Sequence, residues 1–491
     1  MNRFSEKLLR KWVGFGPRFL PFADAATPEL PLGRLLRLAL LQVSVGMALV
    51  LLIGTLNRVM IVELGVPASL VGLMISLPLL FAPFRALIGF RSDTHRCELG
   101  WRRVPYIWKG TMVQFGGLAI MPFALLVLAG AGDSARAPAW IGDVGAALAF
   151  LLVGAGLHTT QTVGLALATD LAPVEKQPNV VGLMYVMLLL GMIASALLFG
   201  SLLVNFTAGR LVQVIQGAAV ATVAINLVAL WKQEARRPRR GTAAAAAPVR
   251  DPTFRESWAT FSAGENTIRR LVAVGVGTMA FSMEDVLLEP YGGQILHLTV
   301  GSTTKLTAAL ALGGLSGFAL ASRVLSRGFD PFRMASVGAL VGVPAFLCVI
   351  FAAPLGSPLL FALGTLLIGF GGGLFGHGTL TATMNRAPEH QRGLALGAWG
   401  AVQASAAGIA VAISGVIRDL VAAAAQHHTS LGSVGGQASG YMAVYAIEVV
   451  LLLLTMVAMA PLVVRRAPPI GASASADAAA AASGDAIVSR G

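Results

Sequence analysis

Charged residues are scarce in this chain of 491 residues. Asp, Glu, Lys and Arg make up 12% of it, whereas an average soluble domain carries about 25%. Hydrophobic residues make up 56%, so the chain has too few polar side chains to cover a water-soluble globule of this length. These proportions exclude an ordinary soluble protein and predict a polytopic membrane protein.

Cysteine is also nearly absent. Cys97 and Cys348 are the two cysteines, one in a short basic segment and one in an apolar run. This excludes a disulfide framework, and no Cys/His spacing typical of a metal site is present. The chain likewise lacks a nucleotide-binding loop, a nucleophile triad and a metal-hydrolase motif. We therefore predict that the protein is not an enzyme and binds no metal through such motifs.

What the chain has instead is a series of apolar runs, each long enough to cross a bilayer as a helix. We count twelve, at residues 35–57, 68–89, 105–129, 142–168, 180–204, 211–231, 268–288, 303–324, 332–353, 357–383, 393–417 and 440–464. They predict an all-α membrane protein with two six-helix halves, at 35–231 and 268–464.

Three polar segments flank these halves. Residues 1–34 begin with Phe4, Leu8 and Trp12 at helical spacing beside basic residues, which predicts an amphipathic helix on the membrane surface; a disordered basic tail is the alternative. Residues 232–267 begin as a charged, Ala-rich stretch that is typical of a flexible linker. The tail 465–491 is rich in small residues, and we expect it to be disordered.

The net charge of +13 is distributed unevenly. With the N-terminus in the cytoplasm, the opposite face would carry five of the 36 Lys and Arg: Arg58, Arg136, Arg210, Lys305 and Arg418. That asymmetry follows the positive-inside rule and places both termini in the cytoplasm. The basic charge thus indicates topology and attraction to membrane lipid, and argues against a nucleic-acid partner.

The two halves resemble each other in sequence. LLVGAG at 151–156 matches LLIGFG at 366–371, an offset of 215 residues, and Gly182 meets Gly397 at the same offset. Asp170 then meets Asn385 in the loop between the matched spans. One ungapped offset across two spans indicates a duplicated six-plus-six architecture, with a central site between the halves.

Glycines are concentrated in the paired fourth and tenth spans, for example Gly154, Gly156 and Gly373. Small residues allow close helix packing in a membrane. The alternative is that Gly373 and its neighbours clear space for a flat, bulky ligand.

Ionisable residues within apolar spans are costly and are candidates for function. Aligning the first and seventh spans sets Arg58 opposite Glu289. We predict that Arg58 pairs with Glu289 or Asp285, either as a latch on the periplasmic side or as a fixed link between the halves. Glu284 and Asp285 are also candidate proton-coupling groups. Glu448 lies in the middle of the last span without an obvious partner.

Two histidines lie inside paired spans, His158 in the fourth and His377 in the tenth. At the repeat offset, His377 aligns one helical turn from His158. A neutral imidazole is a suitable axial ligand for the magnesium of a chlorin ring, and Gln161 could anchor a ring carbonyl. The alternative is that both histidines are hydrogen-bonded packing residues.

A short basic segment, GFRSDTHRCELGWRRVPYIW at 89–108, joins the second and third spans. It resembles the loop signature of major facilitator superfamily transporters, with about four extra residues before its Arg-Arg end. The matching residues are Gly89, Asp93, Arg96, Gly100, Arg102 and Arg103. The resemblance implies that Asp93 pairs with Arg96, Arg102 or Arg103, caps a helix end and stabilises one conformational state.

Five longer sequence segments resemble one particular family of that superfamily. They are GTLNRVMIVELGVP at 54–67, SLPLLFAPFRALIG at 76–89, HTTQTVGLALATDLAP at 158–173, FSMEDVLLEPYGG at 281–293 and ALGAWGAVQA at 395–404. Together with the basic loop they resemble the PucC/LhaA family, the bacteriochlorophyll delivery branch of that superfamily.

That resemblance implies an inner-membrane protein of the photosynthetic membrane that delivers bacteriochlorophyll to light-harvesting antenna polypeptides or chaperones their assembly. It implies transiently bound bacteriochlorophyll and antenna polypeptides as partners, with the reaction centre or bacteriochlorophyll synthase as further partners. Two alternatives stay open: a pigment-free assembly scaffold, and a proton-coupled transporter of small solutes. A sparse polar lining of the first, fourth, seventh and tenth spans favours pigment over a small polar solute.

Overall fold

The computed structural model describes residues 25–28, 30–80, 88, 91–92, 100–130, 138–173, 176–234, 262–264, 266–386, 392–428 and 433–463. All secondary structure in these residues is helical. Eleven of the described helices are long and apolar enough to cross a membrane, and a shorter apolar helix covers Ala68–Leu79. The predicted all-α fold with twelve spans is confirmed. The segments 1–24, 235–261 and 464–491, which hold most of the predicted surface helix, linker and tail, lie outside the described residues.

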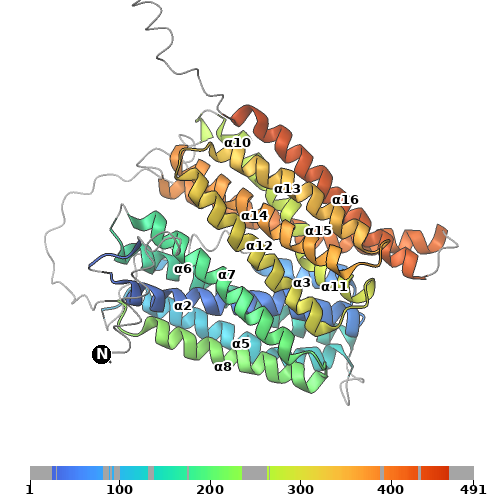
Figure 1. Ribbon diagram of the computed structural model, residues 1–491. Helices are drawn as coiled ribbons and strands as arrows, with labels where there is room; N and C mark the ends of the chain where they lie inside the picture. The colour runs from blue at the N-terminus through green and yellow to red at the C-terminus, as the bar shows by residue number, and fades with distance from the viewer. Residues whose placement is uncertain are drawn as a thin grey trace, which may run out of the picture.

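The first half contains six spans (Figure 1). An α-helix rises about 1.5 Å per residue, so helices of 23 residues (α8) to 33 residues (α6) exceed the hydrocarbon thickness of a bilayer. The first span is α2 (Leu32–Leu49) with the π-helical segments η2 (Val50–Leu56) and η3 (Val59–Glu63), and the others are α3 (Ala68–Leu80), α5 (Val104–Leu128), α6 (Ala139–Leu171), α7 (Gln177–Leu202) and α8 (Ala208–Leu230).

The second half repeats this pattern. Its seventh span is interrupted, running from α10 (Thr267–Ser282) through the 3₁₀ turn η6 (Met283–Val286) to α11 (Leu288–Gln294). The remaining helices are α12 (Val300–Leu325), α13 (Pro331–Ala352), α14 (Pro358–Arg386), α15 (Arg392–His428) and α16 (Ser433–Met459), followed by the short η8 (Ala460–Leu462). Local caps begin several spans: Thr207, Thr299 and Asp330 each accept a hydrogen bond from the backbone N–H three residues on.

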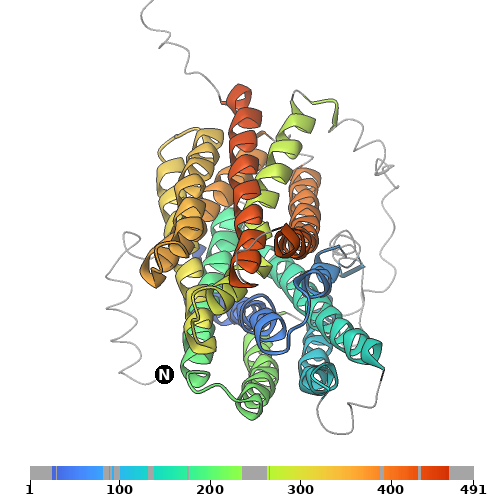
Figure 2. The same cartoon turned by 90° about the vertical axis from the view of Figure 1, so that its right-hand side faces the viewer.

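The two halves lie side by side, with the second above the first in Figure 1 and again in the turned view of Figure 2. They meet where α3 packs on α15 and α7 packs on α12. Glycines bring the backbones together at both seams. A Cβ atom at Gly301 would lie 2.5 Å from the carbonyl oxygen of Gly200, and one at Gly72 would lie 2.7 Å from that of Val411. Small residues therefore hold the halves in contact, as expected for helices packed in a membrane.

Gly373 serves helix packing. A Cβ atom there would overlap the carbonyl oxygen of Gly314 on α12, and one at Gly369 would overlap that of Leu310. The interpretation of Gly373 as a residue that clears space for a ligand is wrong, because its open side is filled by the neighbouring helix. Gly376 differs: no atom lies within 4 Å of the position of its missing Cβ.

We expect the substitution Gly369→Ala to destabilise the second half by about 1–3 kcal/mol, because the added methyl group forces α12 and α14 apart. Thermal unfolding of the purified protein in detergent measures the effect. Gly217→Ala on α8 is the matched control, since no atom lies within 4 Å of that Cβ position and alanine favours helix by up to about 1 kcal/mol. Equal unfolding temperatures for the two variants would contradict the packing role.

Candidate functional site

The first and seventh spans are irregular where they face each other. The first is π-helical over Val50–Leu56 and Val59–Glu63, and the seventh breaks at the 3₁₀ turn Met283–Val286. Asn57 donates a hydrogen bond from Nδ2 to the backbone oxygen of Asp285, at 3.1 Å. π-Helical segments are rare and often mark functional sites, and transporters commonly build their central sites from interrupted helices. The contact between these two irregular spans is therefore the core of the candidate site.

Glu289 occupies a niche beside this contact. Its carboxylate is buried and accepts a hydrogen bond from the Thr307 hydroxyl group. The niche exists because residue 54 is glycine: a Cβ atom at Gly54 would lie 2.6 Å from Oε1 of Glu289. The side chain of the second half thus reaches to the backbone of the first.

Arg58 is buried, and its ion pair is with Glu63. The predicted ion pair with Glu289 or Asp285 is wrong. The physical reason is the π-helical winding, whose backbone hydrogen bonds join residues five apart and so bring residues 58 and 63 close together along the helix. The guanidinium still links the halves, because Nη2 donates to the backbone oxygen of Leu298 at 3.1 Å. Glu289 lies near enough to interact with Arg58 electrostatically, without a direct ion pair.

A second contact between the halves lies at the same end of the bundle, which we call the Arg58 end. Asp419 of α15 accepts a hydrogen bond from the backbone N–H of Ser69, at 2.8 Å, and so caps the start of α3. Arg418 donates to Asp419 at 2.8 Å and to Gln294 of α11 at 2.6 Å. The sequence analysis did not assign Asp419 a role; adjacent charges within an apolar span were the available signal.

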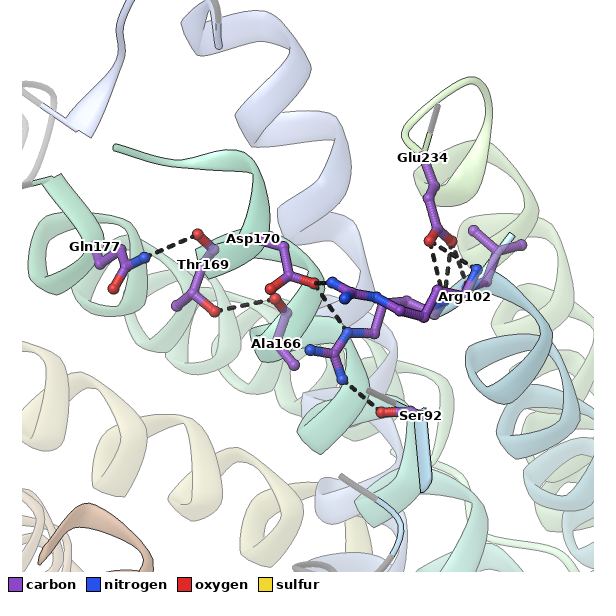
Figure 3. A network of polar contacts seen from close by, with 9 residues as sticks. Ser92, Arg102, Ala166, Thr169, Asp170, Gln177 and Glu234 are labelled. Atoms are coloured by element: carbon purple, nitrogen blue, oxygen red, sulfur yellow. Dashed lines mark hydrogen bonds and ion pairs between the residues drawn. The ribbon is translucent and has the colours of Figure 1, made fainter. Parts of the chain in front are cut away.

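The opposite end, which we call the Asp170 end, contains the described parts of the basic segment between the second and third spans, residues 91–92 and 100–108. Asp170, at the end of α6, accepts hydrogen bonds from Arg102 at 2.5 Å and from Arg103 at 3.0 Å (Figure 3). Arg103 is buried and also donates to Ser92, at 2.6 Å. This network joins the ends of three spans of the first half. Gly89, Asp93 and Arg96, the other predicted signature residues, lie outside the described residues.

Glu234 completes this network, and the sequence analysis missed it. It follows α8, and its carboxylate accepts hydrogen bonds of 2.8–3.2 Å from the backbone N–H groups of Arg102, Arg103 and Val104 (Figure 3). These groups begin α5 and have no partner within their own helix. A carboxylate at a helix N-terminus is favoured by the helix dipole as well as by hydrogen bonding. Glu234 therefore fixes the start of α5 from a helix more than a hundred residues away in sequence.

The residues predicted to bind pigment lie on different helices of the two halves. His158 is half-buried and Gln161 is buried on α6, which packs on α2, α3 and α5. His377 is half-buried on α14, and its ring centroid lies 4.2 Å from that of Phe318 on α12. Phe318 in turn lies 6.4 Å from Tyr185 of α7. A row of three rings, His377–Phe318–Tyr185, thus crosses the seam between the halves.

The arrangement of helices is that of a known class of membrane proteins. The fold has a TM-score of 0.64 to a bacterial homologue of the lysosomal transporter Spinster, at 14% identity over 87% of this chain and 95% of that one. It has a TM-score of 0.61 to a bacterial homologue of the iron transporter ferroportin, at 17% identity over 87% and 97%. The protein therefore has the fold of the major facilitator superfamily transporters.

Sequence relatives define the family more closely. Residues 55–467 match the family described as PUCC protein, and the chain belongs to this family. It is 65% identical to Protein PucC of Rhodovulum sulfidophilum over 86% of this chain and 92% of the relative, and 58% identical to Protein PucC of Cereibacter sphaeroides over 94% and 98%. A more distant relative, 27% identical over 82% and 91%, is the Bacteriochlorophyll synthase 44.5 kDa chain of Rhodobacter capsulatus.

We expect Asp170→Asn to lower the stability of the protein by about 1–2 kcal/mol, because buried Arg103 loses its charged partner while Arg102 and Asp170 are themselves partly exposed. Unfolding in mixed detergent micelles measures the change. Asp143→Asn, on the same helix and without an ion pair in the described residues, is the control. A loss of the same size in both variants would show that the network contributes nothing specific.

We expect Asp419→Ala to speed hydrogen exchange at the Ser69 amide roughly fivefold, since a lost N-cap costs about 1 kcal/mol. Exchange followed by mass spectrometry of the peptide covering the start of α3 tests this. Asp330→Ala, which removes the local cap of α13, should leave that peptide unchanged. Unaltered exchange at Ser69 in Asp419→Ala would rule out the cap between the halves.

Proposed function

We propose that this protein is an assembly factor for light-harvesting antenna complexes, which delivers bacteriochlorophyll to antenna polypeptides or chaperones them in the membrane. The role is non-catalytic. Its place is the intracytoplasmic photosynthetic membrane of a bacterium, with both termini and the Asp170 end on the cytoplasmic side, because the basic residues gather there.

Family membership carries this proposal. The chain matches relatives named Protein PucC over most of its length, and the same sequence pattern extends to a relative named as a bacteriochlorophyll synthase chain. Both kinds of relative are covered by more than nine-tenths of their own length. Relatives that align with this chain over more than nine-tenths of their length, one of them named for bacteriochlorophyll, support a shared connection to that pigment.

The geometry around His377 supports pigment as the cargo. Its imidazole is half-buried against Phe318, and the Nδ1 atom is buried with no hydrogen-bond partner in the described residues. Neighbouring Gly376 leaves open space on α14. An imidazole with a free nitrogen is a suitable ligand for the magnesium of bacteriochlorophyll, and aromatic rings beside it favour a flat macrocycle. His158 and Gln161 are the corresponding candidates in the first half.

The test is a near-infrared absorption spectrum and pigment extraction on protein mildly solubilised from its photosynthetic host. We expect about one bacteriochlorophyll for each binding site of the wild-type protein. His377→Leu should weaken pigment binding at least tenfold, which corresponds to a loss of about 1.4 kcal/mol or more of binding free energy. His158→Leu tests the first half in the same way.

The control is His297→Asn, because His297 is exposed and its backbone φ of +53° is one that asparagine tolerates. Antenna polypeptides without pigment would contradict delivery and support a pigment-free scaffold. Neither pigment nor polypeptide would favour the proton-coupled solute transporter.

A further inference from the structure

Glu448 is a buried acidic residue of the last span. It lies in the middle of α16 and is fully buried, and its carboxylate makes no hydrogen bond within 3.5 Å in the described residues, although the backbone of Glu284 lies close enough to interact with it. The structure supplies the neighbours that the sequence did not reveal. Glu448 interacts electrostatically with Glu284 and Asp285, which lie on the 3₁₀ turn η6 against which α16 packs. Glu284 is also buried, and its Oε2 has no partner.

A tyrosine hydroxyl group lies at the same place. Tyr445, one turn before Glu448, is fully buried, and its hydroxyl has no hydrogen-bond partner although it interacts electrostatically with Glu448 and Glu284. Its neighbours are satisfied: Tyr291 donates to the backbone oxygen of Val349 at 3.1 Å, and Tyr441 donates to Gln294 at 2.8 Å. Two carboxyl groups and one hydroxyl group therefore share a buried position, and each has at least one oxygen without a hydrogen-bond partner in the described residues.

Among the described residues, the charged groups around this position offer no cation that pairs with the carboxylates. Arg418 of α15 stacks 4.7 Å from the Tyr441 ring and is engaged by Asp419 and Gln294. The other helices that pack on α16 carry their titratable groups away from Glu448. On α10, Arg269 and Arg270 lie in the first turns. On α13, Arg333 lies in the first turn and Cys348 faces α14. From η6 the facing groups are the acids Glu284 and Asp285, and α11 adds Tyr291.

Unpaired carboxylates cannot remain charged at such a position without a large cost in free energy. Burying one ion without a partner costs several kcal/mol, and two neighbouring carboxylates also repel each other. A bound cation would remove this cost. A proton needs a single carboxylate oxygen, whereas a metal ion needs several ligands, and the described residues contain no group of three His, Cys, Asp or Glu side chains that could hold one.

We propose that Glu284 and Glu448 form a proton-binding site inside the second half, with the Tyr445 hydroxyl as its third polar group. The proton removes the charge of one carboxyl group and turns that group into a hydrogen-bond donor beside the other carboxyl and the tyrosine hydroxyl. The site holds a proton whether or not pigment or polypeptide is bound, so it does not depend on the proposed function. The proposed site lies next to Asp285, whose backbone oxygen accepts a hydrogen bond from Asn57 of the first half.

Infrared difference spectroscopy of the full-length protein in lipid nanodiscs, recorded against pH and in H₂O and D₂O, tests the site. We expect a pH-dependent carboxyl C=O band that shifts in D₂O and is lost in Glu448→Gln and in Glu284→Gln. Tyr445→Phe should keep the band but shift its frequency, because it removes the polar hydroxyl group beside the two carboxyl groups. Asp143→Asn, on α6, is the control and should leave the band unchanged.

Two results would overturn the proposal. One is a wild-type spectrum without any pH-dependent carboxyl band, which requires no variant and therefore does not depend on how the variants fold. The other is loss of the band when Na⁺ replaces choline at constant ionic strength and pH, which would make the ligand a sodium ion. Neither result bears on pigment binding, so failure of this site is distinguishable from failure of the proposed function.

Discussion

Polar groups that cannot reach water must find partners inside the protein, and here several of them find partners across the seam between the two halves. At the Arg58 end, Asn57 and Arg58 of the first half donate to backbone oxygens of the second, and Asp419 of the second caps a helix of the first. Each contact satisfies a group that would otherwise be buried alone. Separating the two halves at this end therefore breaks all of these hydrogen bonds together, so the contact between the halves opens and closes cooperatively.

The irregular helices are what allow these contacts. π-Helical winding in the first span turns Arg58 towards Glu63, and Gly54 leaves the niche that Glu289 fills. The 3₁₀ turn in the seventh span exposes the backbone oxygen that Asn57 binds. In a regular α-helix, each backbone oxygen accepts a hydrogen bond from the N–H group four residues further on. The backbone oxygen that Asn57 binds would then be occupied within its own helix. Irregular backbone is stable at this depth because a facing helix satisfies it.

The second half presents two interior surfaces with different chemistry. Around α16 and η6 lie carboxyl groups and tyrosines, which suit a proton. Along α14 and α12 lie His377, Phe318 and Gly376, the groups on which the proposed pigment site rests. Because the two sets of residues differ, the proposed proton site and the proposed pigment site do not compete for the same side chains.

Much of the fold could be predicted because a bilayer imposes a simple rule: about twenty apolar residues per crossing. Composition alone determined the twelve spans, and the internal repeat determined the two halves. The cost of burying charge also marked Arg58, Glu284 and Glu289 as unusual. Their partners were decided only by the tertiary structure. Arg58 binds Glu63 because the local winding is π-helical, and Arg103 and Glu448 meet Asp170 and Glu284 because helices far apart in the chain pack side by side.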